Sequence, residues 1–370
     1  MKRLMKQIVL TAFVLGVVIT SVAAQGIPGS GLVKGGVAGE AKSLTGAGAT
    51  FPAVLYSKWF SEYAKLTTVE VNYQSIGSGG GIKSISDQTV DFGATDGPMT
   101  DEQLATAKGG KVLHIPMALG AVVPTSNIPE LASSADGLRF TPETLSSIYL
   151  GDIIKWNDAK LVADNPSLAG IDKYIVVVHR SDGSGTSNIW TSYLTAVSEK
   201  WAKQVGAANA VQWPVGLGGK GNEGVAGNVK QTPYSIGYVE EAYAVQNKLS
   251  VGLVKNKAGK FIAPTTKAVT MAAQGVALPD DLRIKLVNSD NAEAFPVVGF
   301  TWILAYAQQT DAPKALALSR LLWWATHDAQ SYNATLEYAP LPLDAVKKAE
   351  VLIKSITING KPALPASIAK

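Results

Sequence analysis

His179-Arg-Ser-Asp-Gly-Ser-Gly-Thr-Ser187 is the most informative run of this 370-residue chain. An apolar run over 174–179 comes before it and predicts a strand, and the pattern over 186–197 predicts a helix. The N-terminus of that helix would present backbone N–H groups without partners and the positive end of a dipole, which favour an oxyanion. Arg180 adds a planar guanidinium suited to two anion oxygens, and the glycines let the backbone approach a ligand. This unit predicts one half of an anion-binding site.

Outside this unit, helical and strand patterns alternate from residue 43 onward, which is typical of an α/β fold. Two long apolar runs with strand character, 112–123 and 296–306, lie on either side of a middle section of about 170 residues. We therefore expect two lobes, each with a central β-sheet flanked by helices, and we interpret the two runs as hinge strands that cross between them. The expected lobes are 43–120 with 299–370 (lobe I) and 121–298 (lobe II).

The N-terminal residues have the composition of a targeting segment. Residues 1–24 combine three early basic residues, an apolar core over 8–19 and small residues at 22–24, which predicts a signal peptide cleaved after Ala24. The alternative is a membrane anchor, but the apolar run is shorter than the about 20 residues that a spanning helix needs. Residues 25–42 are rich in glycine without periodicity, and we interpret them as a flexible leader.

Composition excludes several classes of function. The chain has no cysteine, so disulfides, thiol chemistry and a lipid-modified cysteine are excluded, and we expect an exported protein without a lipid anchor. Removing the three basic residues of the signal peptide from 33 Lys and Arg leaves 30 against 29 acidic residues. That balance provides no basic surface for nucleic acid, so local dipoles would have to hold an anion. The three histidines lack metal-ligand spacing, and we expect neither a metal nor a cofactor.

Two further glycine turns carry hydroxyl groups at the start of predicted helices. They are Gly46-Ala-Gly-Ala-Thr-Phe-Pro52, with Thr50 and Phe51, and Ile76-Gly-Ser-Gly-Gly-Gly81, with Ser78. Each turn also fits a simpler interpretation, an ordinary threonine cap for the first and a tight turn without ligand for the second. For the arginine run, the simpler interpretation is a structural contact between Arg180 and Asp182.

Asp96 follows a predicted strand at the edge where α/β proteins bind ligands. By itself it would be interpreted as a turn or cap residue. A carboxylate beside a fully ionised anion such as sulfate is unfavourable, whereas it can accept a hydrogen bond from the O–H of hydrogen phosphate. We therefore interpret Asp96 as a group that discriminates between oxyanions by repulsion.

Several unusual runs of this sequence closely resemble the periplasmic phosphate-binding proteins of phosphate-specific ATP-driven (ABC) importers. The resemblance extends from residue 43 to about residue 342, is weakest over 257–294 and does not include the glycine-rich leader. The runs that carry it are Leu44–Pro52, Val71–Ser78, Val90–Asp96, His179–Ser187, Trp213–Asn222 and Ile236–Glu240.

The resemblance implies a two-lobed, Venus-flytrap binding protein, a monomer, that closes on inorganic phosphate and delivers it to membrane permease subunits. Asp96 would accept the phosphate proton, Arg180 would donate charged hydrogen bonds, and Asp182 would orient Arg180. The other expected phosphate-binding residues donate N–H or hydroxyl groups and are Thr50, Phe51 and Ser78 from one lobe and Ser184, Gly185 and Thr186 from the other.

Other classes of function remain as alternatives. The ligand could be another oxyanion (arsenate, sulfate or molybdate). The hydroxyls and histidines also allow a phosphatase-like hydrolase, but no Gly-x-Ser-x-Gly motif surrounds Ser78 or Ser184, so we expect no enzyme. The run 216–221 fits a dinucleotide fingerprint with Glu240 about 20 residues on, but Pro214 interrupts the strand that should precede it.

Overall fold

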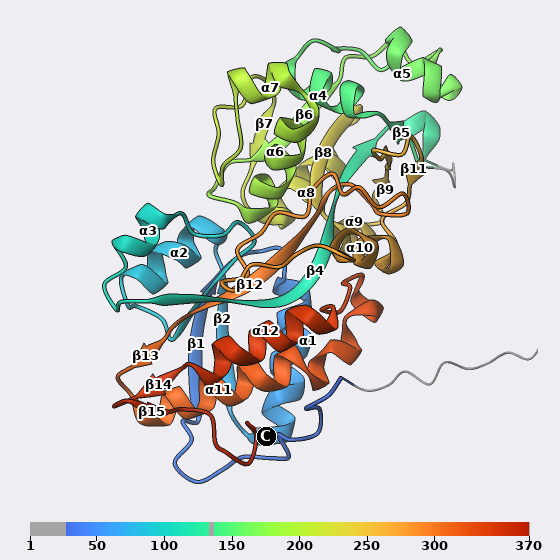
Figure 1. Ribbon diagram of the computed structural model, residues 1–370. Helices are drawn as coiled ribbons and strands as arrows, with labels where there is room; N and C mark the ends of the chain where they lie inside the picture. The colour runs from blue at the N-terminus through green and yellow to red at the C-terminus, as the bar shows by residue number, and fades with distance from the viewer. Residues whose placement is uncertain (1–26, 133–136, 370) are drawn as a thin grey trace, which may run out of the picture.

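Two lobes lie along one curled β-sheet in the computed structural model, which describes residues 27–132 and 137–369 (Figure 1). Strands and helices alternate along the chain, so the predicted α/β class is confirmed. The signal peptide that we predict over residues 1–24 lies outside the described residues. Within the described part of the chain, no helix combines the length and the apolar character needed to cross a membrane.

The central sheet has nine strands, in the order β2-β1-β3-β12-β4-β8-β6-β7 with β9 beside β4. Strands β1, β2 and β3 are parallel to one another, as are β6, β7 and β8, whereas β4 is antiparallel to both β12 and β8. The bounds are β1 (Ser43–Gly48), β2 (Glu70–Ser75), β3 (Phe92–Thr95), β4 (Val112–Asn127), β6 (Val176–Arg180), β7 (Leu217–Gly219), β8 (Ser235–Glu240), β9 (Ser250–Val251) and β12 (Val298–Tyr306). There are also two small sheets in the described structure. One contains β5 (Arg139–Phe140), β10 (Leu253–Lys255) and β11 (Phe261–Ile262). The other contains β13 (Gln308–Gln309), β14 (Thr357–Ile358) and β15 (Lys361–Pro362).

The long strand β4 connects the two lobes. It pairs with β12 up to Ala121 and with β8 from Val122 onward, so one strand belongs to both halves of the sheet. All of its residues except the last are buried, which explains why it appears in the sequence as an uninterrupted apolar run. The two apolar runs that we predicted to be strands are thus β4 and β12. The change of partner at Ala121 lies next to the lobe boundary that we expect between residues 120 and 121.

Helices cover both faces of this sheet. In the first lobe α1, α2 and α11 pack on β1 to β3, and in the second α8, α6 and α9 pack on β4, β6 and β8 (Figure 1). The described helices are α1 (Ala53–Thr67), α2 (Ser78–Ser86), α3 (Asp101–Ala105), α4 (Pro142–Leu150), α5 (Ala159–Asp164), α6 (Gly185–Val197), α7 (Glu199–Gln204), α8 (Gly221–Gln231), α9 (Glu241–Asn247), α10 (Thr266–Ala273), α11 (Ala312–Thr326) and α12 (Leu343–Lys354). Short 3₁₀ turns are η1 (Pro129–Leu131), η2 (Pro166–Leu168), η3 (Asp328–Tyr332) and η4 (Ala334–Leu336).

The described part of the predicted leader differs from our expectation, because residues 27–42 are packed against α11. The guanidinium of Arg320 pairs with Glu40 and donates to the carbonyl of Gly35, and both charged side chains are almost fully buried. The indole of Trp323 also donates to the carbonyl of Gly29 at 3.1 Å. Glycine-rich composition concealed this docking, and the sequence signal for it was an arginine in the middle of the mostly apolar helix α11.

We predict that Glu40→Gln destabilises the protein by about 3–5 kcal/mol, because it leaves the buried Arg320 cation without its counterion. Urea denaturation would measure this loss. The matched control is Glu70→Gln, at an exposed position whose carboxylate pairs with no described residue, and its effect should stay within about 0.5 kcal/mol. Equal effects of the two substitutions would contradict a stabilising role for the docked segment.

Candidate anion-binding site

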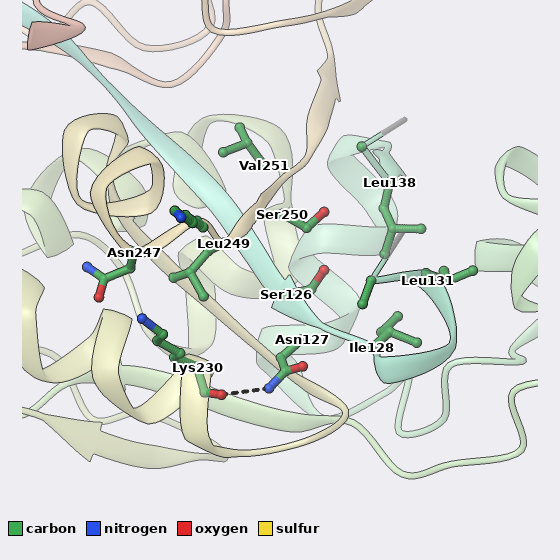
Figure 2. Close-up of a pocket in the computed structure, with 13 residues that line it drawn as sticks. Ser126, Asn127, Ile128, Leu131, Leu138, Lys230, Asn247, Leu249, Ser250 and Val251 are labelled. Atoms are coloured by element: carbon green, nitrogen blue, oxygen red, sulfur yellow. Dashed lines mark hydrogen bonds between the residues drawn. The ribbon is translucent and has the colours of Figure 1, made fainter. Parts of the chain in front are cut away.

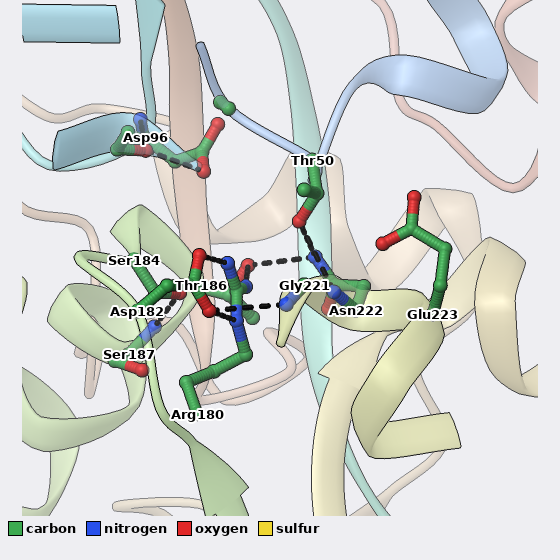
Figure 3. Close-up of polar contacts among 12 residues, drawn as sticks. Thr50, Asp96, Arg180, Asp182, Ser184, Thr186, Ser187, Gly221, Asn222 and Glu223 are labelled. Carbon is green, nitrogen blue, oxygen red and sulfur yellow. Dashed lines mark hydrogen bonds and ion pairs between the residues drawn. The ribbon is translucent and has the colours of Figure 1, made fainter. Parts of the chain in front are cut away.

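The predicted site residues of both lobes converge between two helix N-termini (Figure 3). Ser78 is the first residue of α2, and Gly185 is the first residue of α6, which follows the Arg180 end of β6. Their backbones meet, because the Gly79 N–H donates to the Gly183 carbonyl at 2.8 Å. Every predicted phosphate-binding residue is buried: Thr50, Phe51, Ser78, Asp96, Arg180, Ser184, Gly185 and Thr186.

Five backbone N–H groups at this junction donate to no described residue. They belong to Thr50, Phe51, Ser78, Gly185 and Thr186. The last three lie in the first turn of a helix, where an N–H has no intrahelical acceptor. Buried donors of this kind are normally paired, so the arrangement is suited to an acceptor with several oxygens.

Ser184 differs from its neighbours in what it can offer. Its N–H donates to the carbonyl of Asn209 at 2.8 Å, and its hydroxyl oxygen accepts from the Ser187 N–H at 3.0 Å as the cap of α6. Only the hydroxyl proton of Ser184 therefore remains for a ligand. We expected an N–H or a hydroxyl donor from Ser184, and this pairing is compatible only with the hydroxyl. The sequence does not reveal that Asn209 folds back onto the turn.

Asp96 is buried between the two helix N-termini with one oxygen unused. Its Oδ2 lies 3.3 Å from the Ser78 hydroxyl, and its Oδ1 has no hydrogen-bond partner in the described structure. Burial raises the pKa of Asp96 to about 7, although the neighbouring groups Thr301, Arg180 and Ser78 oppose the shift. A carboxylate that titrates near neutral pH can share a proton with a weakly acidic oxyanion.

One edge of the Arg180 guanidinium is bound by the carboxylate of Asp182. Its Nε and Nη2 donate to the two oxygens of Asp182 at 2.8 and 2.5 Å, and Asp182 also accepts from the Gly221 N–H at 3.0 Å. Burial tends to raise the pKa of Asp182, but the bonds and charge of Arg180 outweigh it and lower this pKa below its ordinary value. The other edge points toward the hydroxyl of Thr186, with Nη1 3.5 Å from Oγ1. The Arg180–Asp182 contact thus leaves one edge of the cation available.

Three residues that sequence reasoning missed bind the Thr50–Phe51 segment. The hydroxyls of Tyr243 and Tyr338 donate to the carbonyls of Thr50 and Phe51, each at 2.6 Å. The carboxamide of Asn222 donates to the Thr50 hydroxyl at 2.7 Å. The tyrosines are remote in sequence and gave no signal. Asn222 directly follows the glycine turn before α8, where a buried amide could have been suspected.

The features behind the rival interpretations have local roles in the structure. Glu240 is fully buried, and its Oε2 accepts from the Ala242 N–H at 3.0 Å and from the Tyr338 hydroxyl at 2.9 Å. Because the whole side chain is buried, Glu240 is not accessible to a ribose. His179 stacks on Trp213 with ring centroids 4.9 Å apart, and its Nδ1 lies 3.0 Å from the Arg180 carbonyl. Among the described residues, no His, Asp and Glu side chains cluster in a way that could hold a metal.

The hollow shown in Figure 2 lies elsewhere. It measures about 590 Å³ and is lined by residues at the end of β4 and around β9, including Ser126, Asn127, Lys230 and Ser250. None of the predicted phosphate-binding residues lines it. The converging helix N-termini, and not this open hollow, are therefore the candidate site.

The chain matches one protein-family model and is similar to several phosphate-binding proteins. The family model for the PBP superfamily domain matches residues 35–321. The phosphate-binding protein PstS of Pasteurella multocida is 42% identical over 318 residues, which cover 85% of this chain and 91% of that relative. The phosphate-binding protein PstS of Haemophilus influenzae is also 42% identical, over 309 residues that cover 83% of this chain and 91% of the relative.

Solved structures share the fold. A high-affinity periplasmic phosphate-binding protein (PfluDING) bound with phosphate superposes with a TM-score of 0.67 at 20% identity, covering 84% of this chain and 93% of the other. The phosphate-binding protein from Stenotrophomonas maltophilia superposes with a TM-score of 0.63 at 17% identity, covering 83% and 92%. These likenesses confirm the expected two-lobed fold.

The close approach of the two lobes generates a prediction about Gly183. A Cβ added at this residue would lie 3.0 Å from the Gly79 Cα, whereas nothing lies within 4 Å of one added at Gly227 in α8. We predict that Gly183→Ala destabilises the closed arrangement by about 1–3 kcal/mol, as overpacking typically does, and raises the radius of gyration in small-angle X-ray scattering. Gly227→Ala should leave the radius unchanged. A Gly183→Ala protein as compact as the wild type would contradict the backbone contact.

Proposed function

The chain belongs to the PBP superfamily and, within it, to the family of phosphate-binding proteins PstS, and from this premise we propose that it binds inorganic phosphate in the periplasm and delivers it to an ATP-driven importer of the inner membrane. The observation that carries the proposal is the buried junction of five N–H groups and one Asp96 oxygen that have no partner among the described residues, together with the edge of Arg180 that does not bind Asp182. Groups of these kinds match an anion that offers both acceptor oxygens and an acidic proton.

The residues have distinct roles in the proposed complex. Lobe I would supply the N–H groups of Thr50, Phe51 and Ser78, and lobe II would supply Arg180 and the N-terminus of α6. Because the donors come from both lobes, phosphate would stabilise the closed arrangement through contacts that neither lobe makes alone. Asp182 would act by orienting Arg180.

Asp96 would provide selectivity, because its carboxylate can accept a hydrogen bond only from a ligand that carries a proton. Hydrogen phosphate and hydrogen arsenate carry an O–H that Asp96 can accept, whereas sulfate at neutral pH does not. When Asp96 is ionised, sulfate would place two unpaired negative groups against each other in a buried site, which is costly. The relatives named above are phosphate-binding proteins, which favours phosphate over the other oxyanions.

Location, partners and the absence of catalysis complete the proposal. The signal-peptide pattern of residues 1–24 and the lack of cysteine support a periplasmic protein without a lipid anchor. The permease subunits of the importer would be its membrane partners, and it would act as a monomer without a cofactor. The relatives named above are phosphate-binding proteins, and His179, which directly precedes Arg180 in the sequence, is stacked on Trp213, which supports a receptor and not a hydrolase.

We predict that Arg180→Ala weakens phosphate binding by about 10- to 150-fold, because a charge-assisted hydrogen bond in a buried site contributes about 1.5–3 kcal/mol. Isothermal titration calorimetry in phosphate-free buffer would measure the change. Arg139→Ala is the matched control, because Arg139 is exposed and its guanidinium lies over Phe261, away from the site. Near-native affinity of the Arg180 variant would count against the proposed site.

We also predict that Asp96→Asn relaxes discrimination against sulfate. The amide removes the repelling charge and adds an N–H donor, so sulfate should compete at least about tenfold better against labelled phosphate in the variant than in the wild type. Equilibrium dialysis with both anions at a pH above 7, where a carboxyl with a pKa of about 7 is mostly ionised, would give the ratio. Sulfate competition that stays negligible in the variant would refute the repulsion argument, because the remaining donors suit either tetrahedral anion.

A further inference from the structure

Asn222 connects the two halves of the proposed site. It is the second residue of α8 and is fully buried, yet it was not among the residues expected to bind phosphate. Its Nδ2 donates to the hydroxyl oxygen of Thr50 at 2.7 Å and to that of Thr186 at 3.0 Å, and its backbone N–H also reaches the Thr50 oxygen at 3.2 Å (Figure 3). One carboxamide thus bridges a hydroxyl from each lobe.

The orientation of this carboxamide is determined by a backbone group. Asn222 Oδ1 accepts from the Glu240 N–H at 2.9 Å. Because a backbone N–H can only donate, the oxygen must face Glu240, and the NH₂ group must face the two threonines. Both amide protons are therefore committed to threonine oxygens.

This commitment restricts what the two hydroxyls can do. A threonine hydroxyl has one proton and two acceptor positions. The Thr50 oxygen accepts two hydrogen bonds from Asn222, and the Thr186 oxygen accepts from Asn222 while facing Arg180 Nη1 at 3.5 Å. Neither hydroxyl proton has an acceptor among the described residues, so each is left to donate.

We propose that Asn222 is a positioning residue: it forces the hydroxyls of Thr50 and Thr186, one from each lobe, to donate into the anion site. The inference rests on the proposed binding of phosphate and adds a specificity determinant to it. An anion with several acceptor oxygens gains two oriented donors at closure, and a ligand that presents a donor at either position finds no acceptor. Asn222 itself need not touch the anion.

Asn222→Asp tests the inference with almost no change in shape. An ionised carboxylate can only accept, so the Glu240 N–H keeps its partner, while the threonine protons turn toward the second oxygen of the introduced carboxylate and away from the site. We expect phosphate affinity to fall about 10- to 1000-fold at pH 8 in calorimetry, and the deficit relative to wild type to narrow at pH 5 as the carboxylate takes up a proton. Asn228→Asp, the same change on the same helix at a residue whose Nδ2 lies 3.4 Å from the Gly218 carbonyl, should bind like wild type.

A double-mutant cycle separates positioning from general support of the fold. If Asn222 acts through the Thr50 hydroxyl, then Asn222→Ala costs clearly less affinity in a Thr50→Val protein than in the wild type. If the fold-losses of affinity from Asn222→Ala and Thr50→Val simply multiply in the double variant, the inference is overturned. It is also overturned if the Asn222→Asp protein is folded, as judged by thermal unfolding, and binds phosphate like the wild type. If the wild-type protein retains no phosphate, both the proposed function and this inference are overturned. If the wild-type protein binds phosphate and the Asn222 variants bind it equally well, only the inference is overturned.

Discussion

Burial of polar groups without protein partners is the constraint around which this molecule is organised. Five N–H donors and an oxygen of Asp96 lie where the two lobes meet and are not paired with described residues. Each buried unpaired group costs about 1–3 kcal/mol, so a ligand that pairs with most of them would favour the closed arrangement. The glycines that let α2 and α6 meet backbone to backbone make the donors converge. Strand β4 pairs with β12 in one lobe and with β8 in the other, so both lobes are part of one sheet.

Local dipoles and a single cation therefore replace a broad basic surface. Without the predicted signal peptide the chain has 30 basic and 29 acidic residues, so the attraction for an anion has to arise at short range. Arg180 supplies one charge, partly offset by Asp182, and the helix N-termini supply the rest. The raised pKa of Asp96, about 7, is close to the second dissociation of a phosphate group, and such a match favours proton sharing between the two. Selectivity and affinity would then come from the same few atoms.

Local patterns in the sequence predicted much of the fold and of the placement of the candidate site residues, and contacts between remote segments account for the rest. Arg180, Asp182 and the start of α6 lie within a few residues of one another, so strand, turn and helix rules sufficed to predict their arrangement. The tyrosine bonds to the Thr50–Phe51 carbonyls span 193 and 287 residues, and no local rule predicts such pairings. The use of the Ser184 N–H by Asn209 and the docking of Glu40 on Arg320 were missed for the same reason. Each depends on a partner that only the folded chain brings close.

The central claim is that one protonated tetrahedral anion is held between the helix N-termini and Asp96, and a crystal structure of the protein grown with phosphate tests it most directly. If this claim is right, a single tetrahedral anion lies between α2 and α6, with one oxygen within hydrogen-bond distance of Asp96 and others facing Arg180 and the N–H groups of Thr50 and Thr186. Phosphate bound at another place, or bound there with Asp96 turned away from every phosphate oxygen, would contradict it.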